Sequence, residues 1–205
     1  MLYRETVDAT TWKLVRELSE ITQNQQFYLV GGTALALQFG HRISVDLDFF
    51  TTQAFDVNTL RVSLESKYQD NLQWTFEKGH ALGATINGVK VDFLRHDYPI
   101  IKPLEEEGIS MLSSMDIAAM KLNAVAKRGS IKDFFDIYEL LESYSLAEML
   151  DFFKSKYQQT GTAYILRSLT YFEDAELESQ PQSIKQVPWR EVKSKIRSIV
   201  EMHFQ

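Results

Sequence analysis

The feature that most restricts the fold of this chain is the order of four short patterns within residues 27–50. The apolar run FYLV ends at Gly31-Gly32, and the segment TALALQF that follows is rich in good helix formers and is closed by a glycine. The alternating segment SVDLDFF then predicts a second strand. A strand, a glycine turn, a short helix and a returning strand together predict an α/β unit.

The rest of the first half extends this unit into a sheet that carries helices. Residues 8–24 and 57–68 have apolar side chains at helical spacing. The segments QWTFEK, LGATI and VKVDFL follow as three strand patterns, and Asn87-Gly88 between the last two is typical of a type I′ hairpin turn. We therefore expect a mixed sheet in the first half of the chain.

The second half shows only helical patterns, and we expect helices near 114–128, 131–143, 145–159, 162–172 and 188–203. Three serines, Ser113, Ser130 and Ser145, each precede an acidic residue by three positions, which is the pattern of a capping box. The sequence thus predicts an α+β protein with two domains: a mixed-sheet core with flanking helices over 1–105, and a helical bundle over 106–205.

Composition limits the classes of function. The chain of 205 residues is 44% hydrophobic, enough for a sizeable core, and it contains no cysteine, which excludes disulfides and thiolate metal sites. A net charge of −6 argues against a broad nucleic-acid-binding surface, and the basic cluster within 185–197 is either a local contact or a solvated helix face with a Glu191–Lys195 pair. With neither a signal-peptide pattern nor an apolar membrane span, we expect a cytoplasmic protein with no membrane partner.

Two aspartates interrupt the apolar pattern of the returning strand. Asp46 and Asp48 are two positions apart, so in a strand they share a face. Carboxylates roughly 6 Å apart repel by about 3 kcal/mol at an effective dielectric constant of about 20. Proton sharing, an arginine or a divalent cation would offset this repulsion. An ordinary turn or cap role is the alternative for either aspartate.

Asp92 alternates with apolar residues in the hairpin strand in the same way, and it joins the pair if the two strands are neighbours. Three carboxylates would suit Mg²⁺ or Mn²⁺ and would favour phosphoryl or nucleotidyl transfer. Gly31 and Gly32 precede a helix N-terminus, whose N–H groups bind anions and to which glycine lets a phosphate come close. The alternative is a plain strand–helix turn.

At this point the sequence resembles a known group of enzymes. GGTALALQFGHRISVDLDFF is similar to the first motif of nucleotidyltransferases in the DNA polymerase β-like superfamily, where a Gly-Gly or Gly-Ser turn and a short helix precede Asp-x-Asp. The closer resemblance is to the AbiEii/AbiGii toxin family, which adds a helical motif with a lysine, an arginine and a Lys/Arg-Asp-x-x-Asp segment. Here that stretch is DIAAMKLNAVAKRGSIKDFFDIYEL.

The resemblance implies roles by position. The phosphate-binding turn would be Gly31, Gly32 and Thr33, and the metal ligands Asp46 and Asp48, with Asp92 as third ligand or general base. The later motif implies catalytic roles for Lys121 and Asp133, with Arg128, Lys132 and Asp136 around them. Apart from the resemblance, we expect Arg42 to contact phosphate and Ser44 to support Asp46.

Physical reasoning from spacing leaves alternatives for the second motif. Lys121 and Arg128 are seven positions apart and share a helix face, where two cations would hold a triphosphate or stabilise the leaving pyrophosphate. Alternatively, Arg128 complements a helix dipole and Asp133 caps its helix through the preceding serine. Asp136 would then pair with Lys132 on the surface, and His41 with Arg42 would cap the preceding helix.

The function that the resemblance implies is a metal-dependent nucleotidyltransferase of the EC 2.7.7 type. It would use Mg²⁺ or Mn²⁺ to move a nucleoside monophosphate from a nucleoside triphosphate (NTP) to an acceptor hydroxyl. It would be the toxin of a toxin–antitoxin or phage-defence pair, with an antitoxin as partner and an RNA such as tRNA as acceptor. Two alternatives stay open: a small-molecule acceptor, and a catalytically silent module that binds a nucleotide or a protein.

Overall fold

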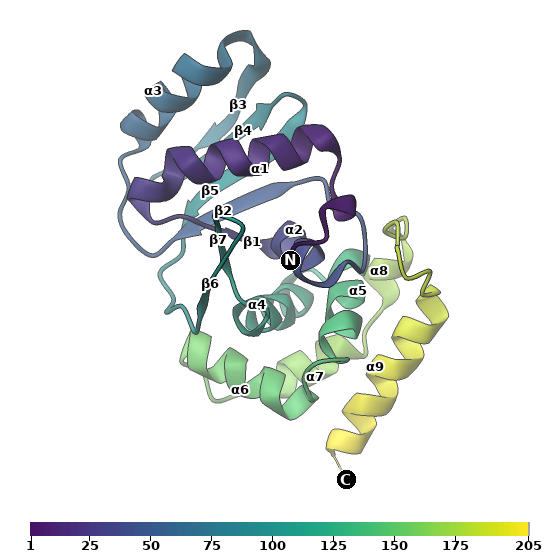
Figure 1. The fold of residues 1–205 in the computed structure, drawn as a ribbon. Coiled ribbons are helices and arrows are strands. Elements are labelled where there is room, and N and C mark those ends of the chain that lie inside the picture. The colour runs from purple at the N-terminus through teal and green to yellow at the C-terminus, as the bar shows by residue number, and fades with distance from the viewer. Residues whose placement is uncertain (205) are drawn as a thin grey trace.

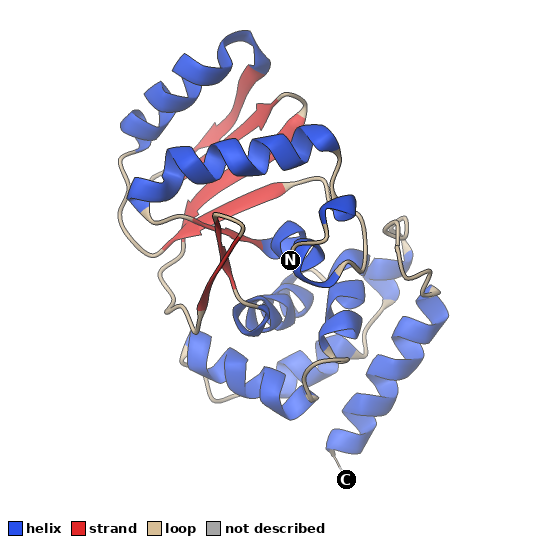
Figure 2. Cartoon of the chain, viewed as in Figure 1, coloured by secondary structure: helices blue, strands red, loops and turns tan. Residues whose placement is uncertain are grey.

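Seven strands form one mixed sheet at the centre of the computed structural model, which describes residues 1–204, in the order β3-β4-β5-β2-β1-β7-β6 (Figure 2). The strands are β1 (Tyr28–Val30), β2 (Leu47–Thr51), β3 (Leu72–Glu77), β4 (Ala81–Ile86), β5 (Val89–Arg95), β6 (Pro103–Glu106) and β7 (Ile109–Leu112).

Helices cover the sheet and then gather into a separate group. They are α1 (Ala9–Thr22), α2 (Gly31–Phe39), α3 (Val57–Tyr68), α4 (Ser114–Lys127), α5 (Ile131–Leu140), α6 (Leu146–Tyr157), α7 (Ala163–Leu169), α8 (Glu173–Glu176) and α9 (Trp189–His203). In Figure 1, α1 crosses one face of the sheet, whereas α4–α7 and α9 gather at the end away from β3 and β4. This is the α+β fold expected from the sequence. Within residues 1–204, no helix is both long and apolar enough to cross a lipid bilayer.

The pairing of β2 fixes the centre of the molecule. β2 runs antiparallel to β1, with Val30 opposite Asp48, and parallel to β5, with Asp48 opposite Asp92. The expected neighbourhood of the two carboxylate strands is therefore confirmed. On the opposite face of the same strands, Phe49 and Phe93 are fully buried and stack with ring centroids 5.6 Å apart. Burial of each such ring contributes about 1.5–3 kcal/mol, so core packing holds the two aspartates side by side.

The sequence predicts one of two hairpins, β4–β5, but not the other, β6–β7. Asn87 and Gly88 both have positive φ, as a type I′ turn requires. Residues 103–112, however, form the β6–β7 hairpin, and β7 pairs parallel with β1. The expected boundary between residues 105 and 106 falls inside β6, so the sheet continues to Leu112. The division into two domains stays a prediction.

Only one of the three expected capping boxes forms. The Ser145 hydroxyl accepts from the backbone N–H of Glu148, whose carboxylate accepts from Ser145 N–H at 2.8 Å. Ser113 and Ser130 make no such cap, and those two predictions are wrong. The acidic residues of these two expected capping boxes are buried and pair with lysines instead: Asp116 with Lys156, and Asp133 with Lys121. A buried lysine provides a stronger partner for a buried carboxylate than a serine does.

Candidate active site

A cavity of about 270 Å³ lies where β1 ends and β2 begins. Of the residues predicted for the site, its walls contain Gly31, Gly32, Arg42, Ser44, Asp46, Asp48, Lys121 and Arg128. The other three lie one contact behind the wall: Thr33 is hydrogen-bonded to Ser44, Asp133 to Lys121 and Arg128, and Asp92 forms an ion pair with Lys90. The structure thus brings both sequence motifs to one cavity.

The glycine turn forms the floor of this cavity because no larger residue fits there. Gly31 has φ +71°, and a Cβ at this position would lie 2.6 Å from the Asp48 Oδ2 atom. A Cβ on Gly32 would collide with the guanidinium of Arg42. The N-cap of α2 is Val30, which offers no side-chain acceptor, so the first N–H groups of the helix have no side-chain cap. Such a turn suits close approach of an anion.

Thr33 and Ser44 hold the segment that leads into β2. The Thr33 hydroxyl lies 2.8 Å from the Ser44 hydroxyl and also contacts the carbonyl oxygen of Asp46. Since a hydroxyl has a single proton, Thr33 donates to the carbonyl and accepts from Ser44. Thr33 is only 1% exposed. Its side chain therefore positions the Asp46 backbone, and the support expected from Ser44 reaches Asp46 through Thr33.

The aspartates differ in their surroundings. Asp48 follows the first residue of β2, and its pKa is raised, chiefly by burial and then by the negative charge of Asp92, against the opposing charges of Lys121 and Lys90. Asp92 is nine-tenths buried: its Oδ2 atom lies 2.9 Å from Lys90 Nζ, while its Oδ1 atom is buried without a hydrogen-bond partner. Of these two carboxylates, only Asp92 thus has an ion-pair partner among residues 1–204.

Asp46 precedes β2 and does not belong to the strand, contrary to the expected alternation. Its side chain is 42% exposed and lies 3.8 Å from Lys132 Nζ. Among residues 1–204, no three acidic or histidine side chains stand close enough to form a ready metal-binding cluster. The donors that are present nevertheless suit a hard divalent cation, because Asp48 and Asp92 are adjacent, under-neutralised carboxylates and one oxygen has no partner.

Behind the cavity, two aspartates of α5 and two cations form a buried group that we name the ionic layer: Arg42, Lys121, Asp133 and Asp136. Arg42 binds Asp136 through Nε at 2.7 Å and Nη2 at 3.0 Å. Lys121 Nζ lies 2.8 Å from Asp133 and 2.5 Å from Asp136. Burial alone would raise the pKa of Asp136, but Arg42 and Lys121 overcome it and hold that pKa well below its usual range.

The ionic layer overturns the alternatives considered for α5. Asp133 is fully buried and accepts hydrogen bonds from Lys121 and Arg128, so it does not cap the N-terminus of α5 together with Ser130. Asp136 is equally buried and pairs with Arg42, so it forms no surface pair with Lys132. His41, placed before as a helix cap, binds Asp136 through Nε2 at 2.7 Å.

Arg128 connects the ionic layer to the cavity. Its Nε atom donates to Asp133 at 2.9 Å, yet 59% of its side chain is exposed and it lines the cavity. The bond to Asp133 and the charge of that carboxylate raise the pKa of Arg128 against burial. Arg128 is therefore a cation with one fixed partner and room for an anionic ligand. Lys121 also lines the cavity but is already shared by two carboxylates.

Four residues of the wall were absent from the expected site: Ile43, Val45, Lys90 and Pro181. Lys90 lies two positions before Asp92 on β5, so the alternation that identified Asp92 could also have identified it. Pro181 belongs to the segment before α9, which runs beside residues 41–43: Ile43 N–H donates to the Gln182 carbonyl at 2.9 Å. Neither a motif nor a periodic pattern in the sequence marks this proline.

The basic cluster of the last forty residues is largely neutralised. Lys185 and Lys193 each lie 2.5 Å from a glutamate, Glu139 and Glu176 respectively, and Lys195 pairs with Glu142. The expected Glu191–Lys195 pair is wrong, because Glu191 accepts a hydrogen bond from the Tyr138 hydroxyl at 2.6 Å. The lysines of this cluster thus pair with glutamates of other segments and present little free positive charge to a nucleic acid.

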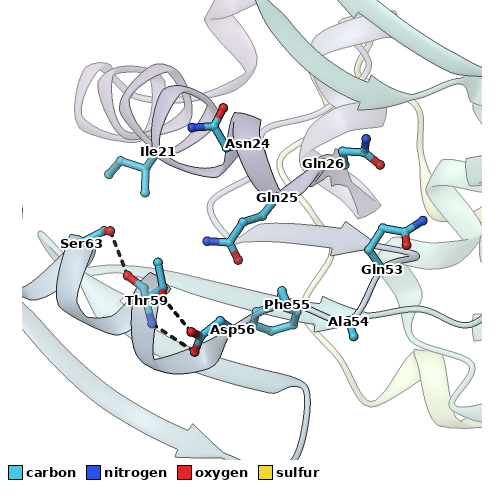
Figure 3. Close-up of a pocket in the computed structure, with 10 residues that line it drawn as sticks. All are labelled: Ile21, Asn24, Gln25, Gln26, Gln53, Ala54, Phe55, Asp56, Thr59 and Ser63. Atoms are coloured by element: carbon cyan, nitrogen blue, oxygen red, sulfur yellow. Dashed lines mark hydrogen bonds between the residues drawn. The ribbon is translucent and has the colours of Figure 1, made fainter.

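A larger cavity of about 720 Å³ lies at the opposite ends of β1 and β2 (Figure 3). Its lining includes Gln25, Gln26 and Gln53, and none of the described residues that line it is a lysine or an arginine. Figure 3 shows that its carboxylate, Asp56, is bonded to Thr59 at the start of α3. Without cations, this cavity does not suit a polyphosphate.

Comparison with known proteins agrees with this geometry. The structure resembles MenT4, the nucleotidyltransferase toxin Rv2826c from Mycobacterium tuberculosis H37Rv, with a TM-score of 0.57 and 12% identity over 93% of this chain and 82% of that one. It also resembles the Megavirus polyadenylate synthase, with a TM-score of 0.50 and 19% identity over 64% of this chain and 31% of that one. At these identities the likeness shows the fold.

Sequence comparison gives the family. An uncharacterized protein of Aquifex aeolicus (strain VF5) is 36% identical over 154 residues, which are 73% of this chain and 75% of that protein. The model of the family described as nucleotidyl transferase AbiEii toxin, type IV toxin–antitoxin system, matches residues 12–81 and 68–202. The chain therefore belongs to the AbiEii toxin family of nucleotidyltransferases.

Proposed function

We propose that the protein transfers a nucleoside monophosphate from an NTP to an acceptor hydroxyl in the cavity at Gly31 and Asp48. The observation that carries the proposal is the register of β2 and β5, which sets Asp48 beside Asp92 at a cavity floored by glycine. Asp46 and Asp48, with Asp92 behind them, would hold Mg²⁺ or Mn²⁺. When bound, such a cation neutralises charge on the attacking and leaving oxygens.

The chain's own residues divide the remaining work. The backbone of the Gly31-Gly32 turn receives the phosphates, and Arg128 and Lys132, each about half exposed, lie within the same wall to bind them. Lys121 lines the cavity and contributes positive charge there, whereas Asp133 is fully buried and acts only by orienting Lys121 and Arg128. Asp92 serves as third ligand or as general base for the acceptor hydroxyl.

The acceptor we propose is an RNA such as tRNA, and the partner a cognate antitoxin in the cytoplasm. Membership of a type IV toxin–antitoxin family supports the antitoxin, and the similarity of the fold to a polyadenylate synthase supports an RNA acceptor. A net charge of −6 and the neutralised lysines of the C-terminal region confine the RNA contact to the cations at the cavity. The contact would therefore be short and close to the reacting hydroxyl.

The test is label transfer from each of the four NTPs to total RNA in the presence of Mg²⁺. We compare the wild type with Asp48→Asn and with a control, Asp151→Asn, which changes an exposed carboxylate paired with Lys154. Wild type and the control should label RNA with one preferred NTP, and chelation of the metal should stop both. Equal labelling by Asp48→Asn would refute the assigned site. Label found only on small molecules would replace RNA as the acceptor.

A further inference from the structure

Two lysines lie against the outer carboxylates of the site. Lys90 Nζ is 2.9 Å from Asp92 Oδ2, and Lys132 Nζ is 3.8 Å from Asp46 Oδ2. They come from β5 and α5 respectively, and both line the cavity. Asp48, between the two aspartates, forms no ion pair among the described residues. Each carboxylate that would hold a cation at the edge of the site thus already has an ammonium group beside it.

The Lys90–Asp92 pair joins two side chains of unlike exposure. They are two positions apart on β5 and so share a face. The Lys90 side chain is 55% exposed, whereas Asp92 is nine-tenths buried. A buried carboxylate needs a counter-charge, but an exposed lysine loses little when it leaves such a pair, because exposed ion pairs contribute only about 0–1 kcal/mol. The lysine satisfies one oxygen of Asp92 and leaves the other without a partner.

We propose that Lys90 is a displaceable counter-ion: its ammonium pairs with Asp92 while no divalent cation is bound and competes with that cation for the carboxylate. The inference rests on the proposed function, since it assumes that Asp92 faces a cation. A lysine suits this role better than an arginine, because its ammonium makes single, readily exchanged bonds on a flexible stem. Once displaced, it stays in the cavity wall, beside the position proposed for the phosphates.

Lys132 is the weaker counterpart. Its contact with Asp46 is 0.9 Å longer than that of Lys90 with Asp92, as the difference between 3.8 Å and 2.9 Å gives. Asp46 is also far more exposed, so water screens this pair more strongly. If ion pairing with a ligand carboxylate determines the competition, removal of Lys132 should therefore affect cation binding less than removal of Lys90.

The experiment measures Mn²⁺ binding to the NTP-free full-length protein from the electron paramagnetic resonance signal of free Mn²⁺. Lys90→Met and Lys132→Met are compared with Lys78→Met, an exposed lysine in the β3–β4 turn, beside the opposite end of β5. Lys90→Met should lower the Kd about three- to fivefold, which corresponds to an exposed ion pair. Lys132→Met should lower it less, and Lys78→Met should leave it unchanged.

A double-mutant cycle separates direct competition from the general effect of removing a positive charge. In an Asp92→Asn background, Lys90→Met should no longer tighten Mn²⁺ binding, because the shared carboxylate is gone while Asp46 and Asp48 remain. A gain that persists there would overturn the inference. Equal Kd for wild type and Lys90→Met would also overturn it, yet leave the proposed function intact. Absence of Mn²⁺ binding by the wild type would refute both.

Discussion

The ionic layer and the carboxylates of the cavity use the same residue types and lie next to each other, but their charges are balanced differently. In the layer, Asp136 is fully buried and accepts bonds from His41, Arg42 and Lys121. At the cavity, Asp48 is half-buried beside another aspartate and has no ion-pair partner among residues 1–204. The pKa of Asp136 is accordingly held low, and that of Asp48 is raised. We call a charge saturated when ion-pair partners neutralise it and unsaturated when they do not. The saturated charges of the ionic layer hold the structure together, and the unsaturated charges at the cavity are available to a ligand.

The largest effect should come from breaking the saturated group. Asp136→Asn leaves Lys121 with Asp133 as its one carboxylate partner and takes from buried Arg42 the carboxylate that it binds, and loss of one member of a buried pair costs about 3–5 kcal/mol. We expect the free energy of unfolding, measured by urea denaturation, to fall by that amount. Asp151→Asn, which breaks an exposed pair with Lys154, should change it by less than about 0.5 kcal/mol. Similar values for the two variants would mean that the layer is not structural.

Removing the unsaturated charge of Asp48 should lower activity strongly without lowering stability. Asp48→Asn should lower nucleotidyl transfer about 1000-fold, as expected when a group that stabilises transition-state charge is lost. Its free energy of unfolding should equal or exceed that of the wild type, because the repulsion between Asp48 and Asp92 disappears. Urea denaturation and label transfer on the same preparations check both. A variant that loses stability in proportion to activity would show that Asp48 belongs with the structural charges.

The glycine beside Asp48 gives a smaller effect. Gly31→Ala adds the strain of a positive φ, about 1–2 kcal/mol, and a Cβ 2.6 Å from Asp48 Oδ2. We expect lower stability and lower activity, because the carboxylate must move. The matched control is Gly88→Ala, which has φ +82° and open space around its Cβ. It should show the strain in urea denaturation while keeping full activity. Equal activity of the two variants would contradict close contact between the turn and Asp48.

Local patterns in the sequence were enough to predict the parts of the site that depend on one strand or turn. Alternation placed Asp92 opposite the core, and the order of glycine turn, helix and strand identified the fold. The resemblance gave the later motif its residues. Spacing could not predict which face of α5 is buried. Residues three apart share a side of the helix, but no local pattern predicts that Arg42 and Lys121 contact that side.

The remaining misses have the same origin in long-range contacts. The strands β6 and β7 have four residues each, and the exposed Glu105 in β6 resembles a polar linker until β7 pairs with β1. Pro181 reaches the cavity because its segment pairs with the backbone at Ile43, more than 130 positions earlier. Contacts of this separation depend on the whole topology, so a single sequence read in short windows could not predict them.

The pH dependence of stability sharpens the contrast between the two aspartates and should be the smallest effect. The pKa of Asp136 in the folded protein lies well below its ordinary value of 3.8, so its contribution to stability is present above pH 3.8 and is lost as pH falls through the folded pKa. The pKa of Asp48 is raised, so ionisation of Asp48 lowers the free energy of unfolding. This destabilisation is absent well below pH 3.8 and is complete above the folded pKa. Urea denaturation between about pH 3 and pH 7 should therefore show both variants diverging from the wild type as pH rises, Asp136→Asn towards lower stability and Asp48→Asn towards higher. Curves for Asp48→Asn and wild type that stay parallel over this range would mean that Asp48 is already neutralised by Lys121 and Lys90, and the distinction between saturated and unsaturated charge would fail.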